Sequence, residues 1–60
     1  MRPPAPDNVK AKRARLGMTQ REAGQVVHCS QVAWGRWESG ARKMHPAFWE
    51  LFNIKTKRKS

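Results

Sequence analysis

The sequence is poor in cysteine, in acidic residues and in long apolar runs. Its single cysteine, Cys29, has no partner for an intramolecular disulfide, which excludes a disulfide scaffold and agrees with a reducing compartment. There is no CxxC motif, and His28 and His45 lack ligand spacing, so neither a metal nor another cofactor is expected. Apolar runs such as residues 47–49 are far below the ~20 residues that cross a bilayer. The sequence therefore predicts a soluble protein that is not exported.

Positive charge is the main feature that is present. The chain carries 13 Lys+Arg against 4 Asp+Glu, a formal net charge of +9 on 60 residues. Such an excess favours a polyanionic partner, either nucleic acid or an anionic membrane surface. A peptide that lies on a membrane would form one continuous amphipathic helix, whereas Gly17, Gly40 and Pro46 divide this sequence. No membrane partner is therefore expected.

The short chain also argues against catalysis. One small domain of this length buries only about 60% of the surface that the unfolded chain exposes, which leaves no room for a deep two-lobed cleft. The 4 acidic residues are scattered singly, and no nucleophile, base and acid come together in the sequence. Neither an enzyme nor a small-molecule substrate is expected.

The first segment is a proline-rich arm followed by a helix. Prolines within residues 1–6 deny the backbone its helical hydrogen bonds and favour an extended arm. Asp7 is expected to cap a helix that runs through Leu16, because Gly17 suits the left-handed residue that follows a helix.

A second helix is signalled by a capping box. Thr19 and Glu22 fit the S/T-x-x-E pattern, which places the first helical residue at Gln20 and the end near His28. Gly24 leaves room for another backbone to approach closely. The expected apolar face consists of Ala23, Val26 and Val27.

A third helix is expected over residues 31–39. Ser30 is a good N-cap, Cys29 and Trp34 have the spacing of a hydrophobic staple, and Gly40 closes the helix.

A basic loop, residues 41–44, leads to a fourth helix from Pro46 to about Asn53. Its expected core residues are Phe48 or Trp49, Leu51 and Phe52. From Lys55 to Ser60 the chain is basic and has no apolar residue, which predicts a disordered tail. The predicted fold is all-α, with four short helices in one domain over residues 7–54.

The short gap between the second and third helices suggests a helix-turn-helix. The residues that carry this pattern are Lys12 to Gln20, Ala23, Gly24, Val27, Ser30, Trp34 and Trp37 to Gly40. They resemble the XRE or Cro/repressor family of phage and bacterial DNA-binding domains, whose fold is that of the lambda repressor. The tryptophan-rich third helix and the ending after His45 resemble small phage and prophage regulators, including anti-CRISPR-associated autorepressors.

The chain departs from the family pattern at three places. His28 stands where glycine usually makes the left-handed turn, a conformation that histidine tolerates better than most residues. Trp34 and Trp37 replace aliphatic core residues, and the fifth helix that is common in the family is missing.

The resemblance implies which residues face DNA. Those expected to contact bases are Gln31, Val32, Gly35 and Arg36. Gln31 suits adenine, Arg36 suits guanine, Val32 suits a thymine methyl, and Gly35 permits close approach. The alternatives are a solvated Gln31 and an Arg36 that binds phosphate or stays free.

Phosphate contacts are expected on both sides of the third helix. The candidates are Thr19, Gln20, Ser30, Ser39, Arg42 and Lys43. The resemblance also implies an ion pair between Arg13 and Glu38 that joins the first helix to the end of the third. The aromatic residues could stack on bases, but their spacing favours the core.

The predicted function is sequence-specific binding of double-stranded DNA, with repression of the protein's own operon in a bacterial or phage-infected cell's cytoplasm. One short recognition helix reads only about 4 to 5 base pairs, so a homodimer on an inverted repeat is expected, joined through the fourth helix and Ile54. An antitoxin of a toxin-antitoxin pair is the alternative, although 60 residues leave little chain for binding a toxin.

Overall fold

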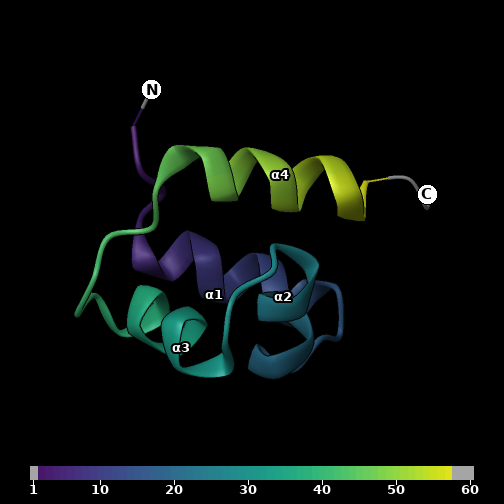
Figure 1. Ribbon diagram of the computed structural model, residues 1–60, viewed down its shortest axis with the longest axis horizontal. Helices are drawn as coiled ribbons and strands as arrows, with labels where there is room; N and C mark the ends of the chain where they lie inside the picture. The colour runs from purple at the N-terminus through teal and green to yellow at the C-terminus, as the bar shows by residue number, and fades with distance from the viewer. Residues whose placement is uncertain (1, 58–60) are drawn as a thin grey trace.

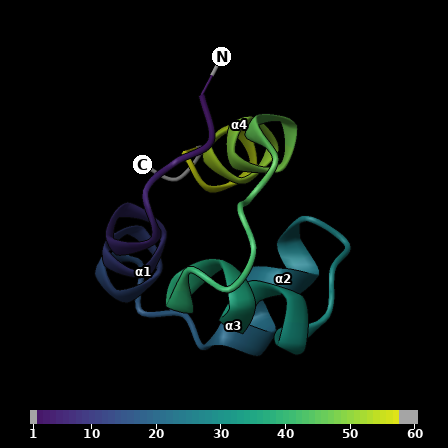
Figure 2. The same ribbon diagram turned by 90° about the vertical axis from the view of Figure 1, so that its left-hand side faces the viewer.

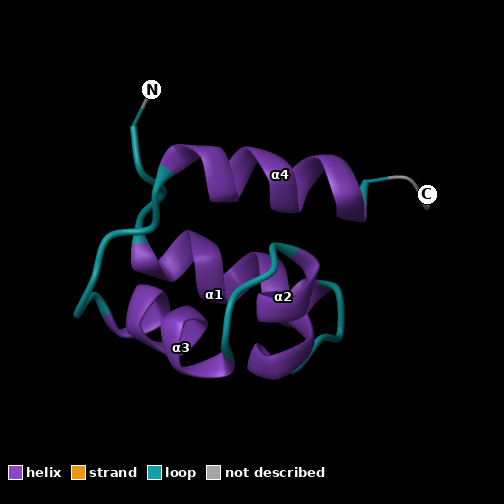
Figure 3. Ribbon diagram, viewed as in Figure 1, coloured by secondary structure: helices purple, strands orange, loops and turns teal. Residues whose placement is uncertain are grey.

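Local capping signals divide the chain into four helices. The computed structural model describes residues 2–57 and contains α1 (Pro6–Arg15), α2 (Gln20–Val26), α3 (Gln31–Ser39) and α4 (Pro46–Thr56) (Figure 1). No strand occurs within these described residues (Figure 3). The predicted all-α fold of four short helices is confirmed. In the same part of the chain no helix is both long enough and apolar enough to span a membrane.

The caps of α2 and α3 form as predicted. The Thr19 hydroxyl accepts the Glu22 N–H at 3.1 Å, and the Glu22 carboxylate accepts the Thr19 N–H at 2.9 Å. The Ser30 hydroxyl accepts the Ala33 N–H at 3.1 Å. Each bond satisfies a backbone donor that the first turn of a helix leaves free.

The first helix begins earlier than the sequence suggested. It starts at Pro6 with Ala5 as N-cap, and Ala5 makes no side-chain cap, so the expected cap at Asp7 is wrong. Proline has its φ fixed near the helical value and lacks the N–H that would be unsatisfied there, which makes it a favourable first helical residue.

The last helix continues further than expected. It runs to Thr56, whose hydroxyl donates to the Phe52 carbonyl at 2.8 Å, so Lys55 and Thr56 belong to α4 and not to a disordered tail. Asn53, the expected last residue, is in the helix interior. The helical part of the chain accordingly runs from Pro6 to Thr56, and residues 58–60 of the expected tail lie outside the described residues.

The turn between α2 and α3 depends on two backbone features. His28 has φ 62°, the left-handed conformation expected at this position. The Cys29 N–H donates to the Gly24 carbonyl at 2.8 Å, and a methyl group at Gly24 would lie 2.8 Å from the Cys29 carbonyl oxygen. The turn therefore packs directly on Gly24, where no side chain fits.

Aromatic residues form the centre of the core. Trp34 and Phe52 are fully buried with ring centroids 4.9 Å apart, and Trp37 is 5% exposed. The other fully buried side chains include Met44, Val9 and Val27. The core prediction is confirmed for Trp34, Trp37 and Phe52, while Phe48 and Trp49 are half-buried.

The helices are arranged so that α3 and α4 lie at opposite ends of the molecule. Figures 1 and 2 show α4 at the top and α3 at the bottom, with α1 at intermediate height. α3 packs against α2 and α1. One side of α3 is thereby buried, and the side away from α4 is left open.

Candidate nucleic-acid interface

The outward side of α3 carries the residues that the sequence assigned to bases. Gln31 and Gly35 are four residues apart, as are Val32 and Arg36, which places the two pairs side by side on one face of the helix. Gln31 and Arg36 are exposed, and Val32 is 61% exposed, unusually high for an aliphatic side chain in this small domain. The buried face carries Trp34 and Trp37 instead, so the domain holds α3 by its aromatic side and presents its polar side.

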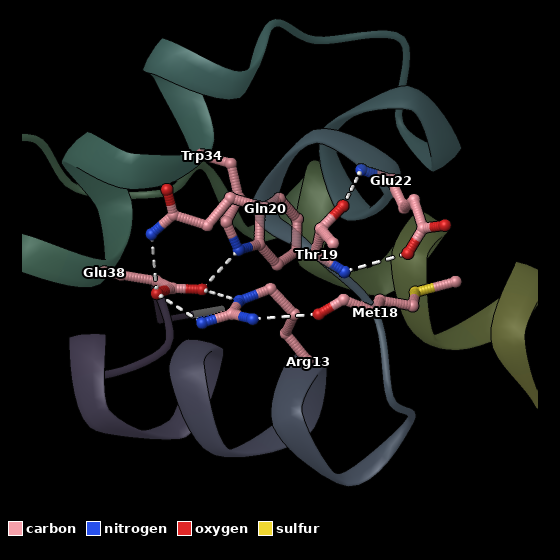
Figure 4. A network of polar contacts seen from close by, with 7 residues as sticks. All are labelled: Arg13, Met18, Thr19, Gln20, Glu22, Trp34 and Glu38. Atoms are coloured by element: carbon pink, nitrogen blue, oxygen red, sulfur yellow. Dashed lines mark hydrogen bonds and ion pairs between the residues drawn. The ribbon is translucent and has the colours of Figure 1, made fainter.

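A single carboxylate fixes the position of α3. Glu38 accepts from Arg13 Nε at 2.5 Å and from Arg13 Nη2 at 3.1 Å, and its side chain is 5% exposed. It also accepts from Gln20 Nε2 at 3.0 Å and from Trp34 Nε1 at 2.6 Å. Figure 4 shows these side chains converging on Glu38 from α1, α2 and α3. The network therefore joins three helices at one buried anion.

The same arginine anchors the entry to α2. Arg13 Nη1 donates to the Met18 carbonyl at 2.8 Å, just before the Thr19 cap (Figure 4). The fork of the guanidinium thus holds both α3 and the segment that begins α2.

The ionisation of Glu38 follows from these contacts. Burial acts to raise the pKa of Glu38, but hydrogen bonds from Arg13, Gln20 and Trp34 and the charge of Arg13 together lower it below its usual range. The hydrogen bond to Glu38 raises the pKa of Arg13. Both groups are therefore charged at neutral pH.

Trp34 is one of two members of this network that sequence reasoning missed, the other being Gln20. Trp34 was expected in the core only, yet its indole N–H bonds the carboxylate of Glu38 one turn later. A buried indole N–H needs an acceptor, and residues four apart on a helix are neighbours. The spacing of Trp34 and Glu38 was the available signal.

The expected phosphate-binding hydroxyls are not equally free. Thr19 and Ser30 use their oxygens as acceptors within their caps, which leaves each hydroxyl hydrogen available as a donor. Ser39 donates its hydrogen to the Arg36 carbonyl at 3.2 Å. Ser39 would have to give up that bond to donate to a phosphate.

Gln20 is partly engaged inside the protein. Because an ionised Glu38 can only accept, the Gln20 atom that faces it is the amide nitrogen, whose second hydrogen stays available. The Gln20 carbonyl oxygen lies over Gly35, at 3.4 Å from the position of a methyl group there. The Gln20 amide is thus held next to the open face of α3.

The basic loop after α3 adjoins the end of the same helix. The Arg42 N–H donates to the Arg36 carbonyl at 3.2 Å, and the side chains of Arg42 and Lys43 are exposed. The structure therefore places two cations beside the C-terminal end of α3.

Cys29 carries the single thiol of the sequence and packs against the core. Among residues 2–57, no three His, Cys, Asp or Glu side chains come together as metal ligands. Burial raises the pKa of Cys29, which is half-buried against the core and so favours the neutral thiol.

Comparison with known proteins agrees with this arrangement. A family model described as a helix-turn-helix domain matches residues 8–52. The chain is also 37% identical over 54 residues to the type II methyltransferase M.MspI of Moraxella sp.. That match covers 90% of this chain but only 13% of the methyltransferase, so the chain is similar to a small part of that protein.

Proposed function

The chain belongs to the helix-turn-helix domain family of DNA-binding proteins, and on that basis we propose that it represses transcription of its own operon by occupying the promoter. The proposal includes base contacts from Gln31, Val32 and Arg36, with Gly35 allowing close approach. It also includes phosphate contacts from Thr19, Gln20, Ser30, Ser39, Arg42 and Lys43.

The observation that carries this proposal is the open polar face of α3 beside the Glu38 network. Base recognition requires that a helix enter the major groove in a defined orientation. The ion pair of Arg13 with Glu38 and the amide of Gln20 hold α3 against α1 and α2 from the inside, which supports a fixed orientation. The side chains that reach outward are left free to bond base edges.

The proposed assembly is a homodimer on an inverted repeat. Two short recognition helices reach useful specificity when they read half-sites about 34 Å apart. The proposed contact between protomers uses α4 around Ile54. This side chain is 58% exposed, a large exposed fraction for isoleucine.

A second candidate function is a DNA-binding domain that regulates the gene of a methyltransferase. It is favoured by the similarity to M.MspI, in which the matching segment is one part of a longer protein. Footprinting on DNA upstream of the protein's own gene and upstream of a methyltransferase gene separates the two candidates. Protection of the methyltransferase upstream region alone would favour the second.

The residue roles are tested by comparing Arg36→Ala with Arg42→Ala on the footprinted site. Loss of a base contact by Arg36→Ala is expected to cost about 1–3 kcal/mol of binding and to relax discrimination at one guanine. Loss of a phosphate contact by Arg42→Ala is expected to weaken binding to every duplex and to reduce the salt slope by about 0.9. Affinities for the operator, single-base variants and random duplex at several salt concentrations provide the measurement.

The opposite pattern would overturn the assignment. If Arg36→Ala weakens all duplexes equally and lowers the salt slope, Arg36 binds phosphate and the reading face is misplaced.

A further inference from the structure

An open groove lies between α1 and α4, away from the residues proposed to touch DNA. Its volume is about 350 Å³. It is lined by Asn8, Ala11, Lys12, Arg15, Trp49 and Asn53. None of these side chains belongs to the Glu38 network or to the proposed DNA contacts, and Trp49 is the one that packs against the core.

The groove carries charge of one sign. Lys12 and Arg15 lie one turn apart on α1, and no carboxylate is among the lining residues. Lys12 is half-buried, which places its aliphatic part along the groove wall, while Arg15 is exposed. An acidic group that enters the groove would meet two cations and no carboxylate among the lining side chains.

The other wall of the groove offers apolar and amide surface. Trp49 is half-buried, and its ring is stacked on Phe52 with centroids 6.2 Å apart, which restrains it. Asn53 donates to the Trp49 carbonyl at 2.9 Å, so its own side-chain oxygen remains an acceptor. Ala11 is small and leaves the surface of α1 accessible.

The wall of the groove that carries Trp49 and Asn53 belongs to α4, away from the proposed DNA-reading helix α3. α4 lies at the end of the molecule opposite α3 (Figures 1 and 2). A duplex bound at the open face of α3 would therefore lie on the opposite side of the domain from Trp49.

We propose that this groove docks an acidic segment of a partner protein, with one aliphatic or aromatic side chain of that segment packed on Trp49. Carboxylates of the segment pair with Lys12 and Arg15, and its backbone bonds the amides of Asn8 and Asn53. A single-stranded nucleic acid fits less well, because such ligands stack successive bases on several aromatic rings. Here Trp49 is the single aromatic residue among those that line the groove.

The test uses a short synthetic peptide in which glutamates surround a pair of leucines, and a counterpart with glutamine in place of glutamate. Binding to the full chain is followed by the indole N–H resonances in NMR spectra, with Trp49 assigned from a Trp49→Phe variant. The acidic peptide is expected to shift the Trp49 signal and to leave those of the buried Trp34 and Trp37 in place. The glutamine peptide is expected to bind about tenfold more weakly.

Two variants that each remove two positive charges give matched controls. Lys12→Gln/Arg15→Gln is expected to weaken the acidic peptide about tenfold and to leave operator affinity within about threefold. Arg42→Gln/Lys43→Gln is expected to do the reverse. Only the second variant changes proposed DNA contacts. If the groove does not bind the peptide, the first variant leaves peptide affinity unchanged, and if Arg42 and Lys43 do not bind DNA, the second variant leaves operator affinity unchanged.

Three outcomes would overturn the proposal. Equal loss of peptide affinity in both variants would mean attraction to net charge alone. Loss of operator affinity in Lys12→Gln/Arg15→Gln as large as in the other variant would make the groove part of the DNA surface. A thymidine oligonucleotide of the same length that shifts Trp49 and binds more tightly than the peptide would make the occupant a nucleic acid.

Discussion

Glu38 is the residue at which side chains from α1, α2 and α3 meet. Its carboxylate accepts four N–H groups, two of Arg13 and one each of Gln20 and Trp34. A buried anion with all its acceptor positions filled is favourable, whereas removing a partner leaves a buried charge unpaired. The orientation of α3 therefore depends on one ionised side chain.

Glu38→Gln is expected to lower the free energy of unfolding by about 3 kcal/mol at neutral pH, because Arg13 loses the opposite charge and one accepting oxygen becomes an NH2 group that faces N–H donors. The free energy of unfolding of the variant is also expected to fall less steeply as the pH is lowered. The pKa of Glu38 is lowered in the folded state, so its contribution is complete above the usual value of about 4.3 and is lost as pH falls through the lower folded value. Urea unfolding at several pH values measures both effects. An unchanged midpoint at neutral pH with an unchanged acid slope would contradict them.

The variant Trp34→Phe tests the contribution of the indole N–H apart from that of the aromatic ring. The substitution keeps an aromatic side chain in the core but deletes the bond to Glu38, which is expected to cost about 1.5–3 kcal/mol as a hydrogen bond to a charged group. One of the bonds that lower the pKa of Glu38 also disappears, so acid unfolding should move to higher pH. Trp37→Phe is the matched control, because the Trp37 ring packs 5.5 Å from Trp34 but is not among the donors to Glu38. Equal acid midpoints in the two variants would show that the N–H has no such role.

The turn between α2 and α3 is an element whose geometry requires Gly24. A methyl group there would meet two backbone oxygens, those of Cys29 at 2.8 Å and Ser30 at 2.9 Å, and backbone cannot move aside as a flexible side chain can. Gly24→Ala is expected to destabilise the domain by about 1–3 kcal/mol through overpacking. Denaturant midpoints provide the measurement.

Gly35 supplies the control for this substitution within α3. A methyl group at Gly35 would meet only the side-chain amide of Gln20, at 3.4 Å or more. Gly35→Ala is therefore expected to stabilise the helix by about 0.5–1 kcal/mol while weakening DNA binding, since Gly35 is proposed to allow close approach. A stable Gly24→Ala variant, or a destabilised Gly35→Ala variant, would contradict the packing described for the turn and for α3.

Assembly on DNA is a property of the whole molecule. Mass measurement during titration of a defined duplex is expected to show two protomers for each full inverted repeat. Ile54→Glu changes an exposed side chain, so monomer stability should stay within about 0.5 kcal/mol, while affinity for the full site falls and affinity for a half-site does not. Saturation by one protomer per full site would reject the dimer.

The features that the sequence determined by itself are local ones. The caps at Thr19 and Ser30 and the left-handed residues Gly17 and Gly40 lie where the sequence predicted them, whereas the left-handed His28 was implied by the family resemblance. Each depends on side chains and backbone groups within a few residues, so the chain needs no distant partner to specify them. The error at Asp7 was also local, since Pro6 had the stronger preference for the first turn.

Only the tertiary structure decided which residues far apart in the sequence come into contact. Arg13 and Glu38 are 25 residues apart, and their pairing was implied by the family resemblance rather than by spacing. The bond of Gln20 to the same carboxylate and the groove beside Trp49 had no signal in the sequence at all. Such contacts depend on how helices pack around a common aromatic core, and packing is set by the combined shapes of side chains that the linear pattern keeps far apart.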